Sequence, residues 1–430
     1  MNPSGSFNGI DDWLRWLETL SPHEIDLGLD RVDTILARLS LQQPARVITV
    51  AGTNGKGSSV AMLEALLTAC GERVGCYTSP HVHRFNERIR IDGKTASDQE
   101  IIAAFERIES VREGIALTYF EFGTLAAMVL FDIARPDTVI LEVGLGGRLD
   151  AVNAIEPDAC LITNVTLDHC DWLGEDVEAI AIEKAGIMRR NKPVVFGATT
   201  VPEAIIAASG RLDADLILSG RDFELVANGG GQWHWSGRDV ELAGLQQPSL
   251  AGWHQVQNAA AVLALVESLG LLVSLDAKTV NSSFASLELD GRMQRIHTAG
   301  RNFILDVAHN VDSARVLSES LTNQAENDRV VAVIGVLAGK DVAGIVGALQ
   351  PVINRWIACT PDSQKAVQAD DLARIIVQQA DPSCLICGSV EDAIREAIAR
   401  TTERDLIVIT GSFQTVAPAL RMLDELQCAN

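Results

Sequence analysis

The stretch RVITVAGTNGKGS, residues 46–58, decides the fold, because it joins a short apolar run to a glycine-rich loop. Arg46–Ala51 is typical of a buried strand, and Ser58–Cys70 carries apolar residues at helical spacing. In a strand–loop–helix unit, glycines let backbone N–H groups surround phosphate oxygens, and the helix N-terminus adds its positive dipole end. We therefore predict that Gly52–Ser58 is a phosphate-binding loop.

Two residues of this loop carry side chains suited to a bound nucleotide. We expect Lys56 to reach the outer phosphates and Ser58 to contact Mg²⁺. The spacing departs from the standard P-loop, because Gly57 separates these two residues. The alternative interpretation is a glycine-rich turn with a lysine on the surface. The ordered succession of strand, glycines, lysine, hydroxyl and helix favours the phosphate loop.

Further strand candidates alternate with helical stretches along the whole chain. Continuous apolar runs are typical of parallel strands covered on both faces, and their alternation with helices predicts a doubly wound α/β sheet. The strands expected after the phosphate loop are Arg73–Tyr77, Thr138–Val143, Ala159–Thr163 and Pro193–Phe196. The strands of a second series are Asn302–Val307, Val330–Val336, Arg355–Cys359, Cys384–Cys387 and Leu406–Thr410.

The pattern changes at LDGR, residues 289–292, where Asp-Gly interrupts both periodicities and indicates a hinge. We therefore predict two α/β domains. Residues 1–288 form a P-loop-type domain with a mostly parallel sheet, and residues 289–430 form a C-terminal Rossmann-like domain. Ala227–Gly244 is rich in glycine and contains Trp233 and Trp235, so we expect a β-hairpin excursion there.

Composition and charge exclude several classes of protein. Of 430 residues, 47% are apolar and 21% are charged, which is ordinary globular composition. A net charge of −22 argues against nucleic acid as a partner, because duplex binding needs a basic face. No apolar run reaches the ~20 residues that span a bilayer, and residues 1–8 lack the features of a secretory signal. Eight cysteines without a framework of close spacings indicate a reducing compartment, so we expect a cytoplasmic protein.

Polar side chains follow two strands at the sheet edge where such folds bind ligands. Glu142 ends the strand Thr138–Val143 and is expected to hold Mg²⁺, directly or through water. The alternative is a glutamate that caps a helix or forms a salt bridge. Asp168-His169 follows the strand Ala159–Thr163 and should reach the same edge, although imidazole is an unusual ligand for Mg²⁺.

Two other segments are ambiguous from their residues alone. Glu183–Ile187 lies on an amphipathic helix, where Glu183 and Lys184 would ordinarily form a solvated pair. Thr78–His81 leads into Arg84–Lys94, whose four cations and two anions give a local charge of +2. We expect this segment to attract an anionic ligand, with a solvated loop and hairpin as the alternative.

Seven short motifs occur in one order along the chain. They are Gly52–Ser58 (GTNGKGS), Thr78–His81 (TSPH) with Glu87–Ile89, Thr118–Gly123 (TYFEFG), Leu141–Asp150 (LEVGLGGRLD), Leu167–His169 (LDH), Glu183–Ile187 (EKAGI) and Asp306–Asn310 (DVAHN). Together they resemble the bifunctional dihydrofolate synthase/folylpolyglutamate synthase family of the Mur ligase superfamily. The likeness extends from about Ile25 to Phe413. It departs from the family at Gln414, where relatives often carry histidine, and no role is assigned to that residue.

This resemblance implies an ATP-dependent ligase that adds L-glutamate to a pteroate or a folate. The γ-phosphoryl group of ATP would move to a substrate carboxylate, after which the glutamate amine would displace phosphate. The implied ligands are ATP, Mg²⁺ at two sites, dihydropteroate, reduced folates and L-glutamate, and the expected form is a monomer. Lys56 and Mg²⁺ would neutralise charge in the transition state.

The resemblance also implies roles for individual residues. It places ATP on Thr53, Asn54, Gly55, Lys56, Gly57, Ser58, Asn258, Arg292 and Asp306. It places Mg²⁺ on Ser79, Glu142 and His169, and it makes Lys184 a carbamylated lysine, because a carbamate resembles a carboxylate ligand. It places the pterin on Thr118, Tyr119, Phe120, Glu121, Leu149, Asp150 and Ala151, with the Phe120 ring stacked on the pterin. Lys56, Lys184 and His309 would be the catalytic residues.

Three alternatives to this function remain from the sequence. The first is a folylpolyglutamate synthase without dihydrofolate synthase activity. The second is a Mur-type ligase acting on a UDP-linked precursor, although the 51 residues before Gly52 are expected to be too few for a UDP-binding domain. The third is a nucleotide-dependent binding module without ligation. The pair Cys384 and Cys387 has the spacing of a redox or zinc motif, but we expect it to pack in an apolar strand.

Overall fold

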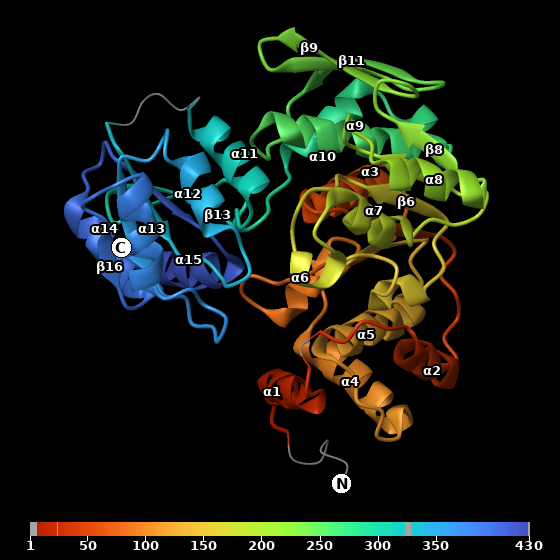
Figure 1. Cartoon of the computed structure of the whole chain (residues 1–430). Coiled ribbons are helices and arrows are strands. Elements are labelled where there is room, and N and C mark those ends of the chain that lie inside the picture. The colour runs from red at the N-terminus through yellow and green to blue at the C-terminus, as the bar shows by residue number, and fades with distance from the viewer. Residues whose placement is uncertain (1–6, 24, 323–327, 429–430) are drawn as a thin grey trace. The chain divides into compact units, whose positions relative to one another are not determined.

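The computed structural model describes residues 7–23, 25–322 and 328–428 of the chain. The chain divides into two compact units, both visible in Figure 1. The first unit comprises Met1–Leu167, Leu173–Pro248 and Val256–Leu287. The second unit comprises Asp168–Trp172, Ser249–Gln255 and Glu288–Asn430. The short segment Asp168–Trp172 therefore belongs to the second unit, although it lies far from the rest of that unit in the sequence.

An eight-stranded sheet forms the centre of the first unit, in the order β4-β3-β2-β5-β1-β6-β7-β8. Its strands are β1 (Val47–Ala51), β2 (Val74–Tyr77), β3 (Ile89–Ile91), β4 (Lys94–Thr95), β5 (Thr138–Glu142), β6 (Ala159–Ile162), β7 (Pro193–Phe196) and β8 (Asp215–Leu218). Neighbours from β2 to β8 are parallel, whereas β3 and β4 form an antiparallel edge. β1, β5 and β6 are buried along their whole length, which explains their continuous apolar sequences.

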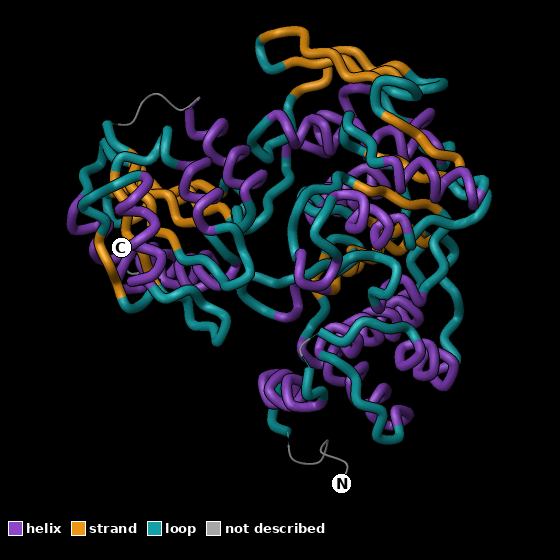
Figure 2. Tube along the Cα trace, in the orientation of Figure 1, coloured by secondary structure: helices purple, strands orange, loops and turns teal. Residues whose placement is uncertain are grey.

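Helices surround this sheet, as the colouring in Figure 2 shows. They are α1 (Ile10–Leu20), α2 (Asp30–Leu39), α3 (Lys56–Ala69), α4 (Asp98–Arg112), α5 (Tyr119–Ala134), α7 (Val177–Ala185), α8 (Glu203–Leu212), α9 (Trp253–Ser268) and α10 (Ala277–Ala285). Capping boxes start two of them, since Ser97 and Thr118 accept hydrogen bonds from the backbone N–H of Glu100 and Glu121. The local sequence therefore determines where α5 begins.

The predicted hairpin excursion is wrong in its strand number. The segment forms a separate three-stranded antiparallel sheet of β9 (Glu224–Gly229), β10 (Gln232–Ser236) and β11 (Glu241–Gln246). Trp233 and Trp235 lie on one face of β10 and are fully buried, each with its indole N–H donating to a backbone carbonyl. The sheet packs on α10 within the same unit (Figure 1). The third strand was missed because its pairing with β10 is irregular near Gly244, whose φ is +74°.

A six-stranded sheet forms the centre of the second unit, in the order β12-β13-β17-β14-β15-β16. Its strands are β12 (Gln294–Thr298), β13 (Arg301–Asp306), β14 (Val330–Ile334), β15 (Arg355–Cys359), β16 (Leu385–Cys387) and β17 (Leu406–Thr410). All of these pairings are parallel except that of β12 with β13. The predicted α/β fold with mostly parallel sheets is confirmed. β8 and β12 were not predicted from the sequence.

The helices of the second unit are α11 (Val311–Thr322), α12 (Val342–Leu349), α13 (Ala369–Gln379), α14 (Val390–Arg400) and α15 (Phe413–Cys428). The short helix α6 (Cys170–Leu173) follows Asp168-His169. Cys387 is buried in β16 and pairs in register with Cys359, as predicted, whereas Cys384 precedes the strand and is half-buried. All eight cysteines lie in the described ranges and are free thiols.

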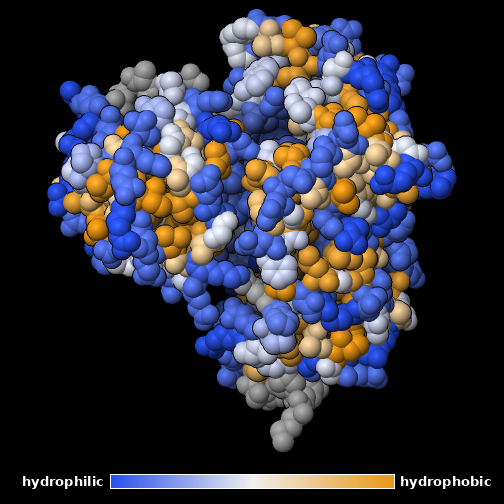
Figure 3. All heavy atoms as spheres, in the orientation of Figure 1, coloured by the Kyte–Doolittle hydropathy of each residue, from blue (hydrophilic) through white to orange (hydrophobic). Residues whose placement is uncertain are grey.

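On the face drawn in Figure 3, groups of hydrophobic residues lie among hydrophilic ones. Among the described residues, no helix is both long and apolar enough to cross a membrane.

Candidate active site

The phosphate loop connects β1 to α3 in a shape that requires glycine at two positions. Gly52 has φ +150° and lies against Thr163, so a Cβ atom there would overlap the threonine hydroxyl. Gly55 has φ +84° and forms the N-cap of α3, close to the side chain of Asn258. α3 therefore begins directly after the short loop that follows a buried parallel strand, as predicted from the sequence.

The end of β6 holds the loop in this shape. The backbone N–H groups of Thr53 and Asn54 donate to the Asn164 carbonyl at 3.1 Å and to its Oδ1 at 2.9 Å. Thr163 Oγ1 donates to the Asn54 carbonyl at 2.6 Å. Lys56 Nζ folds over the loop and lies 3.0 Å from the Gly52 carbonyl oxygen. The loop is thus preorganised by its own neighbours, with the lysine ammonium at its centre.

Glu142 lies beside this loop, as predicted from its place at the end of β5. Its side chain is buried, and its Oε2 accepts a hydrogen bond from the backbone N–H of Ser79 at 3.1 Å. A Cβ on Gly57 would lie 3.9 Å from both oxygens of Glu142. The structure therefore brings together Ser79, Glu142 and the first turn of α3. Oxygen donors beside a phosphate loop suit a hard cation such as Mg²⁺.

Lys184 is buried on α7, so the alternative of a solvated Glu183–Lys184 pair is wrong. Glu183 instead forms an ion pair with Arg148 at 2.8 Å. Gly147 and Gly186 let the loop after β5 approach the end of α7, since a Cβ on Gly147 would lie 2.7 Å from the Glu183 carbonyl oxygen. Backbone atoms of Glu183 and Lys184 therefore lie against the loop, and the Lys184 side chain is buried inside the unit.

The segments expected to hold the pterin meet at the start of α5. The Phe120 ring packs against Gly144, where a Cβ would lie 2.7 Å from it, and its centroid is 5.8 Å from that of Tyr77. Glu121 is buried, completes the capping box with Thr118 and forms an ion pair with Arg31 at 2.9 Å. Arg31 was not predicted, because nothing in its local sequence indicates a partner so far along the chain.

Asp150 precedes a short 3-10 helix, η3 (Ala151–Ala154), and is buried. Its Oδ2 accepts from the Leu145 N–H at 2.8 Å, and its Oδ1 accepts from the Val152 N–H at 3.1 Å. Burial raises the pKa of Asp150 to about 7, although these backbone hydrogen bonds oppose the rise. This carboxyl can therefore change its protonation state near neutral pH.

Two of the four cations in Arg84–Lys94, the segment expected to attract an anionic ligand, form ion pairs with carboxylates. Arg84 donates to Asp98 at 2.9 Å, and Arg90 forms an ion pair with Glu64 at 2.7 Å. These cations are therefore neutralised by partners that lie elsewhere in the sequence. Arg88 differs from them, because its Nε donates to His81 Nδ1 at 2.9 Å rather than to a carboxylate. Burial and the charge of Arg88 lower the pKa of His81 to about 4.

The DVAHN motif follows β13 in the second unit. Asp306 ends that strand and accepts hydrogen bonds from the N–H groups of Met293 at 3.0 Å and Ala308 at 2.9 Å. Burial raises the pKa of Asp306 above its ordinary value, while the charge of Arg292 opposes this rise. Arg292 itself lies over the Phe413 ring, with 5.6 Å between its guanidinium carbon and the ring centroid.

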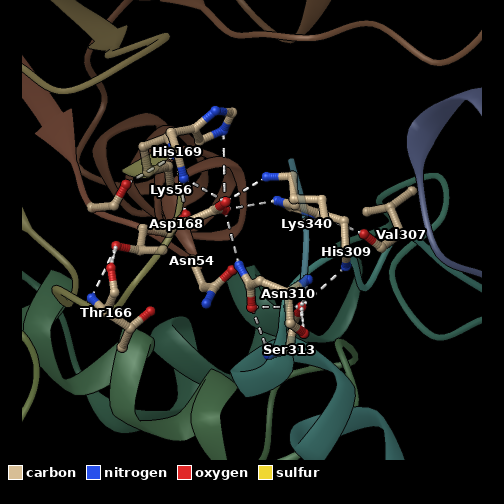
Figure 4. Close-up of polar contacts among 12 residues, drawn as sticks. Asn54, Lys56, Thr166, Asp168, His169, Val307, His309, Asn310, Ser313 and Lys340 are labelled. Carbon is tan, nitrogen blue, oxygen red and sulfur yellow. Dashed lines mark hydrogen bonds and ion pairs between the residues drawn. The ribbon is translucent and has the colours of Figure 1, made fainter. Parts of the chain in front are cut away.

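Asp168 is the centre of a polar cluster in the second unit (Figure 4). Its Oδ2 lies 3.3 Å from His309 Nε2 and accepts from Asn310 Nδ2 at 3.1 Å. Lys340 forms an ion pair with Oδ1. Burial alone would raise the pKa of Asp168, but the hydrogen bond from His309 and the charge of Lys340 hold it well below its ordinary value.

The role of Asp168 was not predicted from the sequence, and neither Lys340 nor Asn310 was expected as a site residue. Asp168 stands directly before His169 in the LDH motif, which was the available signal. Lys340 lies in a loop before α12 with no local pattern to distinguish it from a surface lysine. Among the described residues, no group of three or more His, Cys, Asp or Glu side chains is placed to hold a metal ion.

Two family descriptions match the chain in the expected order. The Mur ligase middle domain matches residues 50–266, and the Mur ligase glutamate ligase domain matches residues 291–413. The dihydrofolate synthase/folylpolyglutamate synthase of Escherichia coli K12 is 40% identical, over 96% of each chain. The protein of the same name from Haemophilus influenzae is 37% identical, over 95% of this chain and 96% of its own.

The chain belongs to the dihydrofolate synthase/folylpolyglutamate synthase family of Mur ligases.

Solved structures of the family share the whole fold. The E. coli FolC complex with DHPP and ADP is 38% identical and superposes with a TM-score of 0.91, covering 98% of this chain and 99% of that one. A bifunctional folylpolyglutamate synthase/dihydrofolate synthase with Mn, AMPPNP and L-glutamate bound gives a TM-score of 0.89 at 38% identity, covering 99% of this chain and 100% of that one. The predicted identity as an ATP-dependent ligase of this family is confirmed.

The residues proposed for the site fall into two groups, one in each unit. The first unit contains the phosphate loop, Asn258, Ser79, Glu142, Lys184 and the pterin segments. The second unit contains His169, Arg292, Asp306 and His309.

Proposed function

We propose that this chain is a ligase that uses ATP to add L-glutamate to dihydropteroate, forming dihydrofolate, and to folates, forming folylpolyglutamates. The observation that carries the proposal is the phosphate loop with Lys56 at its centre and Glu142 beside it. A folylpolyglutamate synthase without dihydrofolate synthase activity is the second candidate, since it would use the same loop. Its distinguishing property is the absence of turnover with dihydropteroate.

The proposed chemistry has two steps. A carboxylate oxygen of the pteroyl substrate attacks the γ-phosphorus of ATP, so that ADP leaves and an acyl phosphate forms. The amine of L-glutamate then attacks the acyl carbon, loses a proton, and displaces inorganic phosphate to form the amide. Because oxide is a poor leaving group and phosphate a good one, the ATP makes amide formation feasible. Positioning and charge neutralisation supply most of the acceleration in such reactions.

ATP is proposed to bind on the loop and on residues from both domains. The backbone of Thr53–Ser58 would surround the phosphates and Lys56 would neutralise their charge. Asn258, next to Gly55, would contact the nucleotide from α9. Arg292 and Asp306 would contribute from the C-terminal ligase domain. For the domain boundary we propose residues 1–288 and 289–430.

Mg²⁺ is the proposed metal, with two sites, on Ser79, Glu142 and His169. The residues of the first unit fit it, because a buried carboxylate and a serine lie together beside the phosphate loop. A divalent cation would supply charge neutralisation of the transferring phosphoryl group. Carbamylation of Lys184 would convert a buried cation into an anionic oxygen donor, and its burial on α7 supports this.

The pterin is proposed to lie on Thr118–Glu121 and Leu149–Ala151. Phe120 offers a flat ring beside Gly144, and Asp150 offers a carboxyl whose pKa is near 7. Glu121 acts through the capping box and its ion pair with Arg31, so it positions the segment. His309 is proposed to assist at the reacting centre, where Asp168 orients its ring.

The protein is proposed to be a monomer in the cytoplasm. The eight free thiols of the described chain support a reducing compartment. Sedimentation at several protein concentrations tests the monomer.

Phosphate release from ATP tests the function. The assay uses dihydropteroate, tetrahydrofolate or a UDP-linked peptidoglycan precursor, each with and without L-glutamate. The proposal requires glutamate-dependent release with the first two substrates. Release with tetrahydrofolate alone would favour the monofunctional enzyme, and release only with the UDP-linked precursor would overturn the proposal.

A further inference from the structure

Arg88 is a buried cation held among aromatic rings. It ends the 3-10 helix η2 (Phe85–Arg88), directly before β3, and the residue is only 8% exposed. Its guanidinium carbon lies 5.5 Å from the centroid of the Phe85 ring and 5.3 Å from that of Tyr119. Its Nε donates to His81 Nδ1 at 2.9 Å. The head group is therefore fixed in place on several sides.

No carboxylate within the described part of the chain forms an ion pair with Arg88, in contrast to its neighbours. Arg84 pairs with Asp98 at 2.9 Å, and Arg90 pairs with Glu64 at 2.7 Å. The carboxylate of the adjacent Glu87 is used by the loop, because it accepts hydrogen bonds from the backbone N–H groups of residues 82–84. The Glu87 carboxylate is thus directed to the backbone.

A buried arginine without a counterion is costly to the fold. Arginine is almost never buried unless it is paired, because the desolvation of its charge needs compensation. The two ring faces provide cation–π attraction, and His81 and the Tyr77 hydroxyl provide acceptors, but none of these groups supplies a full negative charge. Such a group persists where an anionic ligand completes it, as arginine forks do for carboxylates.

The position of Arg88 indicates which ligand this is. Tyr119 belongs to the segment proposed for the pterin, and the Phe85 and Tyr119 rings contact each other at 5.8 Å between centroids. His81 follows Ser79 by two residues, and Ser79 contacts Glu142. Arg88 therefore lies in the first unit between the ring-binding segment and the phosphate-loop edge. A pteroyl substrate has an aromatic body joined to a carboxylate, which matches this order.

We propose that Arg88 binds a carboxylate group of the pteroyl substrate and thereby selects acidic over neutral pteroyl compounds. This inference rests on the proposed function. The carboxylate is that of the benzoyl group in dihydropteroate, or a glutamyl carboxylate in a folate. Both present the same planar anion to the guanidinium. The opposing interpretation is that Arg88 only fills the space between the rings.

The test compares an acid with its ester. Equilibrium binding of pteroate and pteroate methyl ester is measured for the wild type, for Arg88→Met and for Arg84→Met. Methionine keeps an unbranched apolar side chain but removes the charge. Arg84, which is exposed and paired with Asp98, is the matched control on the same loop. The Kd for ATP and the thermal midpoint report the integrity of each variant.

Arg88→Met should weaken pteroate binding about ten- to a hundredfold, the range expected for a lost charge-assisted hydrogen bond, while the ester changes less than about threefold. Arg84→Met should leave both affinities unchanged. An equal effect of Arg88→Met on acid and ester, or no effect on either, overturns the inference. If Arg88→Met does not fold, Arg88→Lys decides the question. Lysine keeps the positive charge but lacks the two parallel N–H donors of a guanidinium. It should therefore reduce the difference in affinity between pteroate and its methyl ester, and an unchanged difference would overturn the inference.

A second pair of ligands identifies the carboxylate. Loss of affinity for dihydropteroate alone assigns the contact to the benzoyl carboxylate, whereas loss of affinity for both dihydropteroate and tetrahydrofolate assigns it to a position that the benzoyl carboxylate of the first and a glutamyl carboxylate of the second can both occupy. Phosphate release by the wild type with dihydropteroate and glutamate tests the proposed function separately from the role of Arg88. Its absence would overturn the proposed function, while ligation with an unaltered acid–ester difference in Arg88→Met would overturn only the role of Arg88.

Discussion

The carboxylate of Asp168 holds the ring of His309, with Oδ2 and Nε2 3.3 Å apart. The other ring nitrogen, Nδ1, lies 2.9 Å from the Val307 carbonyl oxygen. Both nitrogens of His309 therefore face acceptors, so the plane of the ring is fixed. Asn310 and Lys340 bind the same carboxylate and fix Asp168 in turn (Figure 4). A catalytic His309 would thus be oriented before substrate arrives.

Asp168→Asn should lower kcat at least tenfold while changing the KM for ATP little, because it removes the charge that orients His309 and Lys340. Steady-state phosphate release checks the split between kcat and KM. Asp168→Glu should restore part of kcat if orientation is the cause. Asp312→Asn, which removes only an exposed pair with Arg315, is the control. An unchanged kcat in Asp168→Asn would contradict the positioning role.

Lys56→Ala should abolish ligation while preserving the fold. The Lys56 ammonium lies over the carbonyls of the phosphate loop, where phosphates would bind. Removing one such charge from a phosphoryl-transfer site costs about a hundred- to a thousandfold in kcat. Phosphate release and the thermal midpoint together check this result. Lys94→Ala, an exposed lysine on β4, should behave as the wild type, and retained turnover in Lys56→Ala would refute the role.

The Asp405 carboxylate stabilises the second unit, and this stabilisation is lost in acid. The hydrogen bond from Arg329, at 2.9 Å, is the main cause that lowers the pKa of Asp405 from its ordinary 3.8 to about 2. Because the folded pKa is the lower one, this stabilisation is present above pH 3.8 and is lost as the pH falls toward 2.

Asp405→Asn should therefore reduce the free energy of unfolding by about 1–2 kcal/mol at pH 7, and by less at pH 3. Urea unfolding at both values measures the difference. Asp392→Asn, which breaks an exposed pair with Arg395, should change the free energy by less than about 0.5 kcal/mol at either pH. An effect of Asp405→Asn that is the same at pH 7 and pH 3 would exclude the linkage.

Lys184 should carry a carbamate in the active protein. Its buried position on α7, beside the glycine-rich loop, excludes a simple solvated lysine. Native mass spectrometry at mildly alkaline pH should show one CO₂ adduct that is missing in Lys184→Arg. Activity should fall when bicarbonate is removed and return when it is added. Wild-type activity without the adduct and without bicarbonate dependence would contradict the carbamylation of Lys184.

The fold was predictable where burial fixes the sequence locally. β1, β5 and β6 are covered on both faces, so each is a continuous apolar run that any periodicity analysis finds. β8 was missed because four residues ending in a half-buried leucine carry too little pattern. The third strand of the small sheet was missed because its irregular pairing near Gly244 breaks the alternation.

The site was predictable only in part, for a related reason. Glycines and strand-end carboxylates are local signals, so the phosphate loop and Glu142 were found from the residues. Ion pairs are not local signals, because their partners lie far apart in the sequence. Arg90 and Glu64 are 26 residues apart, and Lys340 and Asp168 are 172 residues apart. The net charge of the Arg84–Lys94 segment therefore could not reveal that two of its cations are neutralised and that Arg88 is not.

The central claim is that a pteroyl carboxylate is phosphorylated and then joined to glutamate. Its most direct test uses dihydropteroate labelled with ¹⁸O in the carboxylate, together with ATP and L-glutamate. Mass spectrometry should find dihydrofolate, and inorganic phosphate that carries one ¹⁸O atom from the substrate. Dihydrofolate formed with unlabelled phosphate, or labelled substrate returned unchanged while ATP is hydrolysed, would contradict the claim.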